Sequence, residues 1–119
     1  MAVLPLQDQT FEAAVPVVII GAGACGLTAA FMVADAGVDV LVLERDAAPQ
    51  GSTALSSGMI PACNTNIQKA AGVSDNVDIM TADILSKAHG ENDEAMVRVI
   101  AAESGPAIDW LSEGHDIQL

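Results

Sequence analysis

Three glycines at a fixed spacing are the residues of this chain whose pattern points most directly to chemistry. Gly21, Gly23 and Gly26 form a Gly-x-Gly-x-x-Gly turn that follows the apolar residues 17–20. In such a turn the first glycine permits a tight bend, the second lets the backbone approach a pyrophosphate, and the third lets a helix pack closely on a strand. Backbone N–H groups at the start of that helix bind phosphate oxygens. The turn therefore indicates a dinucleotide site, provided that a strand, a helix and an acidic residue accompany it.

The acidic residue is Glu44, which follows residues 38–43, a run that is apolar except for Asp39. A carboxylate at the carboxyl end of the second strand accepts hydrogen bonds from the ribose hydroxyls of a bound dinucleotide. Its negative charge disfavours a 2′-phosphate, so a phosphorylated nicotinamide cofactor fits less well. The alternative is a tight turn that binds nothing, with Glu44 a solvated strand end. The agreement of turn, flanking elements and carboxylate favours the nucleotide.

The elements around the turn predict a βαβ unit. Residues 15–20 are apolar and rich in β-branched side chains, which is typical of a parallel strand buried on both faces. A helix is expected over residues 25–36, ended by Gly37, and a second strand over residues 38–43. A unit of about 30 residues in this order predicts an α/β fold with a Rossmann-like parallel sheet.

The rest of the chain is expected to be a long loop followed by helices. Residues 47–66 lack a helical period, and an irregular segment of this length is usually functional. One helix is predicted from about residue 77, capped within residues 74–76, and a second that is capped by Asn92. Residues 104–106 (Ser-Gly-Pro) predict a break before a third, short helix, and the last four residues resemble the start of a strand.

Composition excludes several classes of function. The chain has 119 residues, which suit one modest domain, and a formal net charge of −12, which repels nucleic acid and anionic membranes. Residues 13–34 carry no charge and are long enough to suggest a membrane span. Pro16 and three glycines at turn spacing favour a strand, a turn and a buried helix in that segment instead. We therefore expect neither nucleic acid nor membrane as a partner.

The cysteines and the N-terminus bear on the compartment. Cys25 and Cys63 are the only cysteines, and no Cys/His cluster suits a metal ion. We interpret them as free thiols in a reducing compartment rather than as a disulfide. No basic region precedes an apolar segment at the N-terminus, so a secretory signal is not supported. We expect a cytoplasmic protein without a metal site.

A run within the predicted loop has a more specific pattern, PQGSTALSSGMIPA at residues 49–62. Together with the glycine turn and Glu44, it resembles the FAD-binding segment of the fumarate reductase and succinate dehydrogenase flavoprotein superfamily. The resemblance is strongest to the soluble branch, which includes ketosteroid dehydrogenases and flavocytochrome c. In that family a glycine- and serine-rich run leads from the ribose carboxylate past the pyrophosphate to the flavin ring. The resemblance continues to Trp110-Leu111 and covers nearly all of the chain after residue 14.

This resemblance implies FAD as the cofactor. Ser52 and Thr53 would bond its diphosphate region, and Ser57 and Gly58 would lie against the isoalloxazine. Gln50 departs from the family, which usually has a glycine there. Membrane-bound members attach FAD through a histidine just before the paired glycines, and none is present here, so FAD should be held non-covalently. The expected cofactor-binding residues are Gly21, Gly23, Ala24, Cys25, Gly26, Glu44, Arg45, Gly51, Ser52, Thr53, Ser57, Gly58 and Met59.

The resemblance also implies a reaction, namely hydride exchange between flavin N5 and a carbon next to a carbonyl or carboxylate. In the family the remaining strands, the substrate-capping domain and the catalytic arginine come later in the sequence, and no position here matches them. We expect residues 1–14 to be an N-terminal arm and residues 15–119 the N-terminal part of an FAD-binding domain, incomplete alone. The rest of the flavoenzyme would be a separate or cleaved chain, and it would carry the catalytic residues that act on a small-molecule substrate.

Two other functions remain compatible with these residues. A fragment of an NAD-dependent dehydrogenase would carry the same glycine turn and ribose carboxylate. A non-catalytic nucleotide-binding or assembly module that serves a partner protein would also use them.

Overall fold

The computed structural model describes residues 10–11, 13–115 and 117–118, which form two compact units. The first unit extends to Met59 and the second begins at Ile60. The elements of the first unit are β1 (Val17–Ile20), α1 (Ala24–Asp35), β2 (Val40–Leu43) and α2 (Ser52–Leu55). Those of the second are α3 (Asn66–Ala70), α4 (Val77–Lys87) and α5 (Glu94–Gly114).

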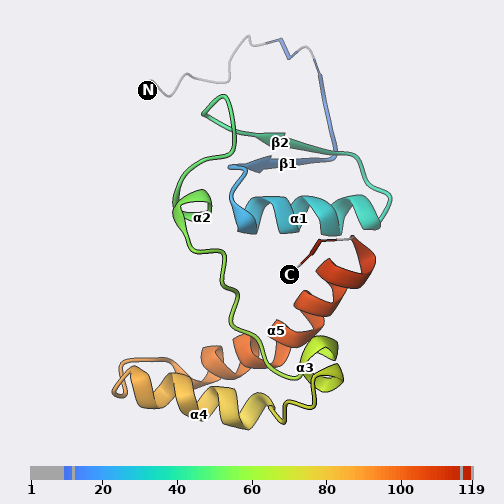
Figure 1. Cartoon of the computed structure of the whole chain (residues 1–119). Helices are drawn as coiled ribbons and strands as arrows, with labels where there is room; N and C mark the ends of the chain where they lie inside the picture. The colour runs from blue at the N-terminus through green and yellow to red at the C-terminus, as the bar shows by residue number, and fades with distance from the viewer. Residues whose placement is uncertain (1–9, 12, 116, 119) are drawn as a thin grey trace. The chain divides into compact units, whose positions relative to one another are not determined.

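The first unit contains the predicted βαβ arrangement. Strands β1 and β2 are parallel, in a register that pairs Val17 with Val40 and Ile20 with Leu43. Helix α1 connects them, contacts both, and runs along one face of the sheet (Figure 1). The α/β class and the Rossmann-like unit expected from the sequence are confirmed.

The two faces of this sheet differ in exposure. Ile19 points toward α1, because its Cγ2 lies 3.3 Å from where a Cβ on Gly26 would be. Side chains alternate along a strand, so Val18 and Ile20 point to the opposite face, where they are 51% and 87% exposed. The expectation of a strand buried on both faces is wrong for the described residues, because one helix covers only one face.

The segment predicted as a long loop is partly helical. Helix α2 occupies four of its residues, and Asn66 at its end begins α3. Thr65 caps α3 with a capping box, in which its hydroxyl accepts from the N–H of Gln68 while the Gln68 side chain accepts from the N–H of Thr65. The absence of a long apolar period hid both helices, since neither is longer than five residues.

The second unit is built mainly on the packing of α4 against α5. Asn76 caps α4 as expected, with its side-chain oxygen accepting from the N–H of Ile79 at 3.0 Å. Helix α5 is capped by Asp93, whose Oδ1 accepts from the N–H groups of Ala95 and Met96. The assignment of that cap to Asn92 is therefore wrong by one residue.

Helix α5 continues through Pro106, where the sequence predicted a break. Its buried residues Val97, Ala101, Gly105 and Ile108 recur at helical spacing on both sides of the proline. A Cβ on Gly105 would collide with the carbonyl oxygen of Cys63, so the glycine admits the segment that packs there. The apolar stripe outweighs the hydrogen bond that proline cannot donate.

Few apolar side chains of the described residues are buried. In the first unit the buried apolar residue is Ala22, and in the second unit they are Cys63, Val97, Ala101 and Ile108. Of the strand expected at residues 116–119, the first and last lie outside the described residues, and the two between them are not in a strand. Most of the expected N-terminal arm also lies outside them. Within the described part of the chain, no helix combines the length and apolar character needed to span a membrane.

Candidate dinucleotide site

The glycine turn lies at the carboxyl ends of the two parallel strands. Gly21 has a φ of +101°, a backbone conformation that glycine adopts without strain. Its N–H donates to the carbonyl of Leu43 at 2.7 Å, so Gly21 is still hydrogen-bonded to β2 and the turn begins after it. The chain then enters α1 at Ala24. In open parallel sheets, ligands bind at this end of the strands.

Gly26 sets the close approach of α1 to the turn. A Cβ at this position would collide with the carbonyl oxygen of Gly21 and lie 3.3 Å from the Ile19 side chain. No side chain larger than hydrogen fits there without moving backbone. This close approach holds the first turn of α1 against the glycine turn at the end of β1.

Thr53 joins the start of α1 to α2. Its Oγ1 accepts a hydrogen bond from the N–H of Ala24 at 3.1 Å. A Cβ on Gly23 would lie 3.5 Å from the same oxygen, which is an ordinary contact. The hydroxyl group keeps its own proton to donate. An N–H at a helix start, a bare glycine and a hydroxyl therefore meet at one place, and such groups suit a phosphate.

Glu44 is hydrogen-bonded to the glycine turn. Its Oε2 accepts from the N–H of Ala22 at 2.8 Å, and its Oε1 accepts from the N–H of Asp46 at 3.1 Å. These two bonds lower the pKa of Glu44 from its ordinary value, and the bond from Ala22 has the larger effect. Arg45 lowers the same pKa by a smaller amount. The carboxylate is thus held charged and oriented, and each oxygen retains lone pairs for ribose hydroxyls.

A cavity of about 140 Å³ lies beside the start of α1 and the helix α2. It is lined by Ala22, Ala24, Leu27, Pro49, Gln50, Thr53 and Ala54. Drug-sized ligands occupy pockets of roughly 300–1,000 Å³, so this cavity is large enough for only part of a dinucleotide. Gln50, where the family pattern has a glycine, is one of the residues that line it.

The structure brings together some of the predicted residues and leaves others apart. The glycine turn, Ala24, Glu44 and Thr53 converge as described above. Cys25 is exposed and does not line the cavity, and the Arg45 side chain is 82% exposed beside Asp46. Gly51 precedes α2 with a φ of +99°, and Ser52 begins that helix. The expected flavin contacts at residues 57–59 are exposed and do not line the cavity.

Sequence reasoning missed several of the residues that line this cavity. Ala22 lies inside the glycine motif, so the motif itself could have identified its N–H as a group at the site. Leu27 follows the turn by one residue, but its apolar type suggested only core packing. Pro49 and Ala54 carry no signal of their own and are placed by α2.

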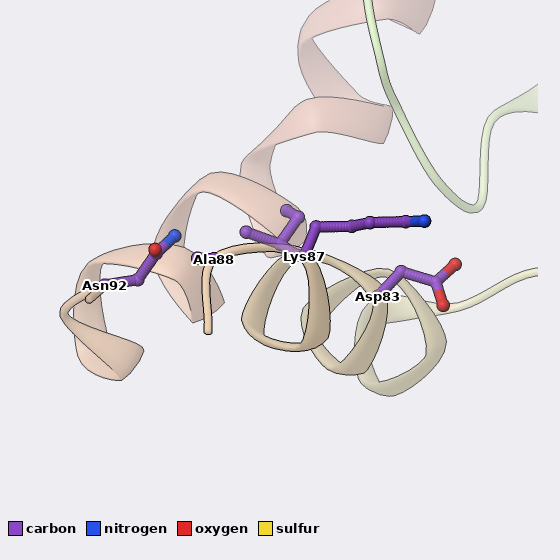
Figure 2. Close-up of a pocket in the computed structure, with 5 residues that line it drawn as sticks. Asp83, Lys87, Ala88 and Asn92 are labelled. Atoms are coloured by element: carbon purple, nitrogen blue, oxygen red, sulfur yellow. The ribbon is translucent and has the colours of Figure 1, made fainter. Parts of the chain in front are cut away.

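A second hollow, of about 410 Å³, lies on the second unit. It is lined by Asp83, Ile84, Lys87, Ala88 and Asn92 (Figure 2). Asn92 lies at one end and the charged ends of Asp83 and Lys87 at the other, so the polar groups do not converge (Figure 2). No group of His, Cys, Asp or Glu within the described residues suits a metal ion. This hollow is the larger of the two, but only the first gathers polar groups at one point.

Comparison with known proteins identifies the ligand class. A family model described as an FAD binding domain matches residues 16–118. The chain belongs to this family. Its cofactor is FAD, and this finding decides against the NAD-dependent dehydrogenase considered from the sequence.

The relatives are reductases of much greater length. A fumarate reductase (cytochrome) of Shewanella frigidimarina is 32% identical over 98 residues, which are 82% of this chain and 17% of the relative. The acrylate reductase flavoprotein subunit of Shewanella woodyi is 39% identical over 106 residues, 85% and 21% of the two chains. A urocanate reductase of Eggerthella lenta is 33% identical over 108 residues, which are 91% of this chain and 18% of the relative. This chain therefore spans about a fifth of the curated relatives that it matches.

A solved structure agrees with the fold. The open conformation of a flavocytochrome c3 fumarate reductase superposes with a TM-score of 0.74 at 28% identity. The superposition covers 83% of this chain and 18% of that one. The resemblance to the fumarate reductase flavoproteins expected from the sequence is confirmed.

The residues present fit FAD. Ala22, Ala24 and Thr53 line a cavity that is large enough for part of the cofactor. Gly23 leaves the approach to the helix start free of any side chain, and the charged Glu44 lies beside the turn. These groups match a diphosphate and a ribose in their chemistry.

Proposed function

We propose that this chain is the N-terminal part of a flavin-dependent oxidoreductase and that it binds the ADP half of FAD. The observation that carries the proposal is a cavity lined by Ala24 and Thr53, which are hydrogen-bonded to each other, and by Ala22, whose N–H donates to the Glu44 carboxylate. In this assignment the first two bind the diphosphate, and the carboxylate accepts hydrogen bonds from the ribose. Family membership and the reductase relatives support it.

The cofactor, when bound, supplies a hydride carrier at its N5 atom. The complete enzyme in this proposal exchanges hydride with a carbon next to a carbonyl or carboxylate of a small substrate. The names of the relatives, which include fumarate, acrylate and urocanate reductases, support a substrate with an unsaturated acid group. The role of the described residues is to bind and orient the cofactor, and the catalytic residues belong to the remainder of the enzyme.

We assign further contacts to FAD as part of the same proposal. Gly51 and Ser52, which lie in sequence between the cavity residues Gln50 and Thr53, would bind the diphosphate, and residues 57–59 would lie against the flavin ring. Cys25 and Arg45, both exposed, would lie beside the pyrophosphate and the adenosine respectively. No histidine is found in residues 44–50, which supports non-covalent attachment. Both cysteines are free thiols, which supports a cytoplasmic location.

The test is the identity and the attachment of whatever co-purifies with the complete protein. A flavin absorption spectrum, with FAD released by acid and an unmodified polypeptide mass, is the expected result. A colourless protein contradicts the assignment of FAD as the cofactor. A polypeptide mass increased by that of FAD contradicts its non-covalent attachment.

A matched pair of variants tests the residue assignment. Thr53→Ser keeps the hydroxyl, whereas Thr53→Val keeps the shape and removes it. We expect Thr53→Ser to retain FAD affinity and Thr53→Val to lose about tenfold, because a hydrogen bond to a charged group contributes roughly 1.5–3 kcal/mol. Equal affinity of the two variants, measured by titration of the apoprotein, would contradict the role of this hydroxyl.

A further inference from the structure

Gln50 brings an unused carboxamide to the cavity beside the start of α1. Gln50 and Thr53 supply the polar side chains of its lining, and the other lining residues are Ala22, Ala24, Leu27, Pro49 and Ala54. The Thr53 hydroxyl already accepts from the Ala24 N–H at 3.1 Å. The Gln50 side chain, in contrast, is exposed and makes no hydrogen bond to another described residue. Its polar atoms are therefore available to a ligand in the cavity.

The charges around this cavity are unfavourable for an anionic ligand. Arg45 is the single basic residue in the described part of the first unit, and it does not line the cavity. Its side chain is 82% exposed and pairs with Asp46 at 3.4 Å. The acidic residues of the same part are Asp35, Asp39, Glu44 and Asp46. Because the summed field of these charges repels a phosphate, the cavity has to bind one through neutral hydrogen-bond donors.

The carboxamide of Gln50 is the richest source of such donors in the lining. A glutamine amide carries two N–H donors, whereas the Thr53 hydroxyl carries one. Hydrogen bonds to an ionised acceptor are roughly twice as strong as those between neutral groups. Since the amide is exposed and unpaired within the described residues, it can turn toward an anion without breaking a bond inside the protein.

We infer that Gln50 binds the diphosphate of FAD through its side-chain N–H groups, in the place where a cation would otherwise be expected. This role rests on the proposed function, which assigns Ala24 and Thr53 to the diphosphate. Both of these residues line the same cavity as Gln50, whereas Glu44, assigned to the ribose, does not. The position of Gln50 therefore favours the diphosphate over the ribose as its partner.

The test titrates FAD into the apoprotein of the complete flavoprotein, with side chains of similar length at position 50. Gln50→Met removes the donors and should weaken FAD binding by about tenfold. Gln50→Glu adds a like charge and should weaken it further, whereas Gln50→Lys should bind at least as tightly as the wild type. The control is Lys87→Gln in the second unit, which lowers the net charge by the same amount as Gln50→Glu and should leave the affinity unchanged.

Phosphorus NMR of the bound cofactor reports the contact itself. The diphosphate resonances of FAD should shift between wild type and Gln50→Met, and should not shift in Lys87→Gln. Wild-type affinity with unshifted resonances in Gln50→Met would overturn the role of Gln50 and leave the proposed function intact. Equal losses of affinity in Gln50→Met and Gln50→Lys would also overturn it, because they would report shape rather than donors. A wild-type complete protein that binds no FAD would overturn the proposed function itself.

Discussion

Alanine at two positions of the glycine turn should separate helix packing from cofactor binding. At Gly26 a Cβ would collide with the backbone carbonyl of Gly21, which has no rotamer by which to move away. Overpacking costs about 1–3 kcal/mol, and a backbone obstacle places this case near the upper value. Alanine regains up to about 1 kcal/mol of helix propensity. We expect a net loss of about 2 kcal/mol in the free energy of unfolding for Gly26→Ala.

Gly23→Ala is the matched variant, because its Cβ would meet only the Thr53 hydroxyl, at 3.5 Å. Alanine is a poorer N-cap than glycine, so we expect a loss of about 0.5 kcal/mol in unfolding free energy. The methyl group would, however, occupy the space through which the pyrophosphate approaches the backbone. FAD affinity should therefore fall by more than about tenfold, equivalent to about 1.4 kcal/mol.

The assays are urea unfolding of the apoprotein, followed by circular dichroism, and FAD titration followed by flavin fluorescence, both on the complete flavoprotein. We expect opposite rankings: Gly26→Ala is the less stable variant, and Gly23→Ala binds FAD more weakly once the folded fraction is taken into account. An unchanged unfolding midpoint for Gly26→Ala, or wild-type affinity for Gly23→Ala, would refute this prediction.

Three further predictions concern single side chains. Because the folded-state pKa of Glu44 is lowered, its stabilising contribution is complete above the unfolded-state pKa and is lost as the pH falls through the folded value. Wild-type FAD retention should therefore decline below about pH 4.5 more steeply than that of Glu44→Gln, and parallel pH profiles would contradict this. Asp93→Ala should lower the unfolding free energy by about 1 kcal/mol and Asn92→Ala by less than about 0.5, as urea midpoints can show; equal effects would return the cap to Asn92. Thr81 buries a hydroxyl that has no partner within the described residues, so Thr81→Val should raise the unfolding free energy by about 1 kcal/mol, and a lower midpoint would indicate a hydrogen bond to water.

The parts of the fold that could be predicted from the sequence depend on local pattern. The βαβ unit follows from two aliphatic runs and a glycine turn, each specified by neighbouring residues. The cap of α4 was predicted within residues 74–76 because polar residues precede an amphipathic period, and the structure selects Asn76 among them. The position of Glu44 directly after the second strand predicts its carboxylate at the site. No local pattern predicts its hydrogen bond from Ala22.

The parts that could not be predicted depend on distant contacts or on close alternatives. Thr53 reaches Ala24 across 29 residues, so no local pattern reveals their bond. Pro106 is a strong local signal for a break, but Gly105 packs against a carbonyl 42 positions earlier and the helix continues. Two cap-forming residues precede α5, and the hydrogen bonds from Ala95 and Met96 to Asp93 select that residue. The flavin contacts at residues 57–59 stay a prediction.

The hydrogen bond from Ala24 to Thr53 has a consequence for the direction in which the Thr53 hydroxyl donates its proton. Because Oγ1 already accepts from the Ala24 N–H, one of its lone pairs is engaged and rotation of the hydroxyl about the Cβ–Oγ1 bond is restricted. The hydroxyl proton is thereby directed away from the helix start, toward a neighbouring acceptor such as a phosphate oxygen in the proposed site. A donor whose orientation is set beforehand loses less rotational freedom on binding, which favours affinity.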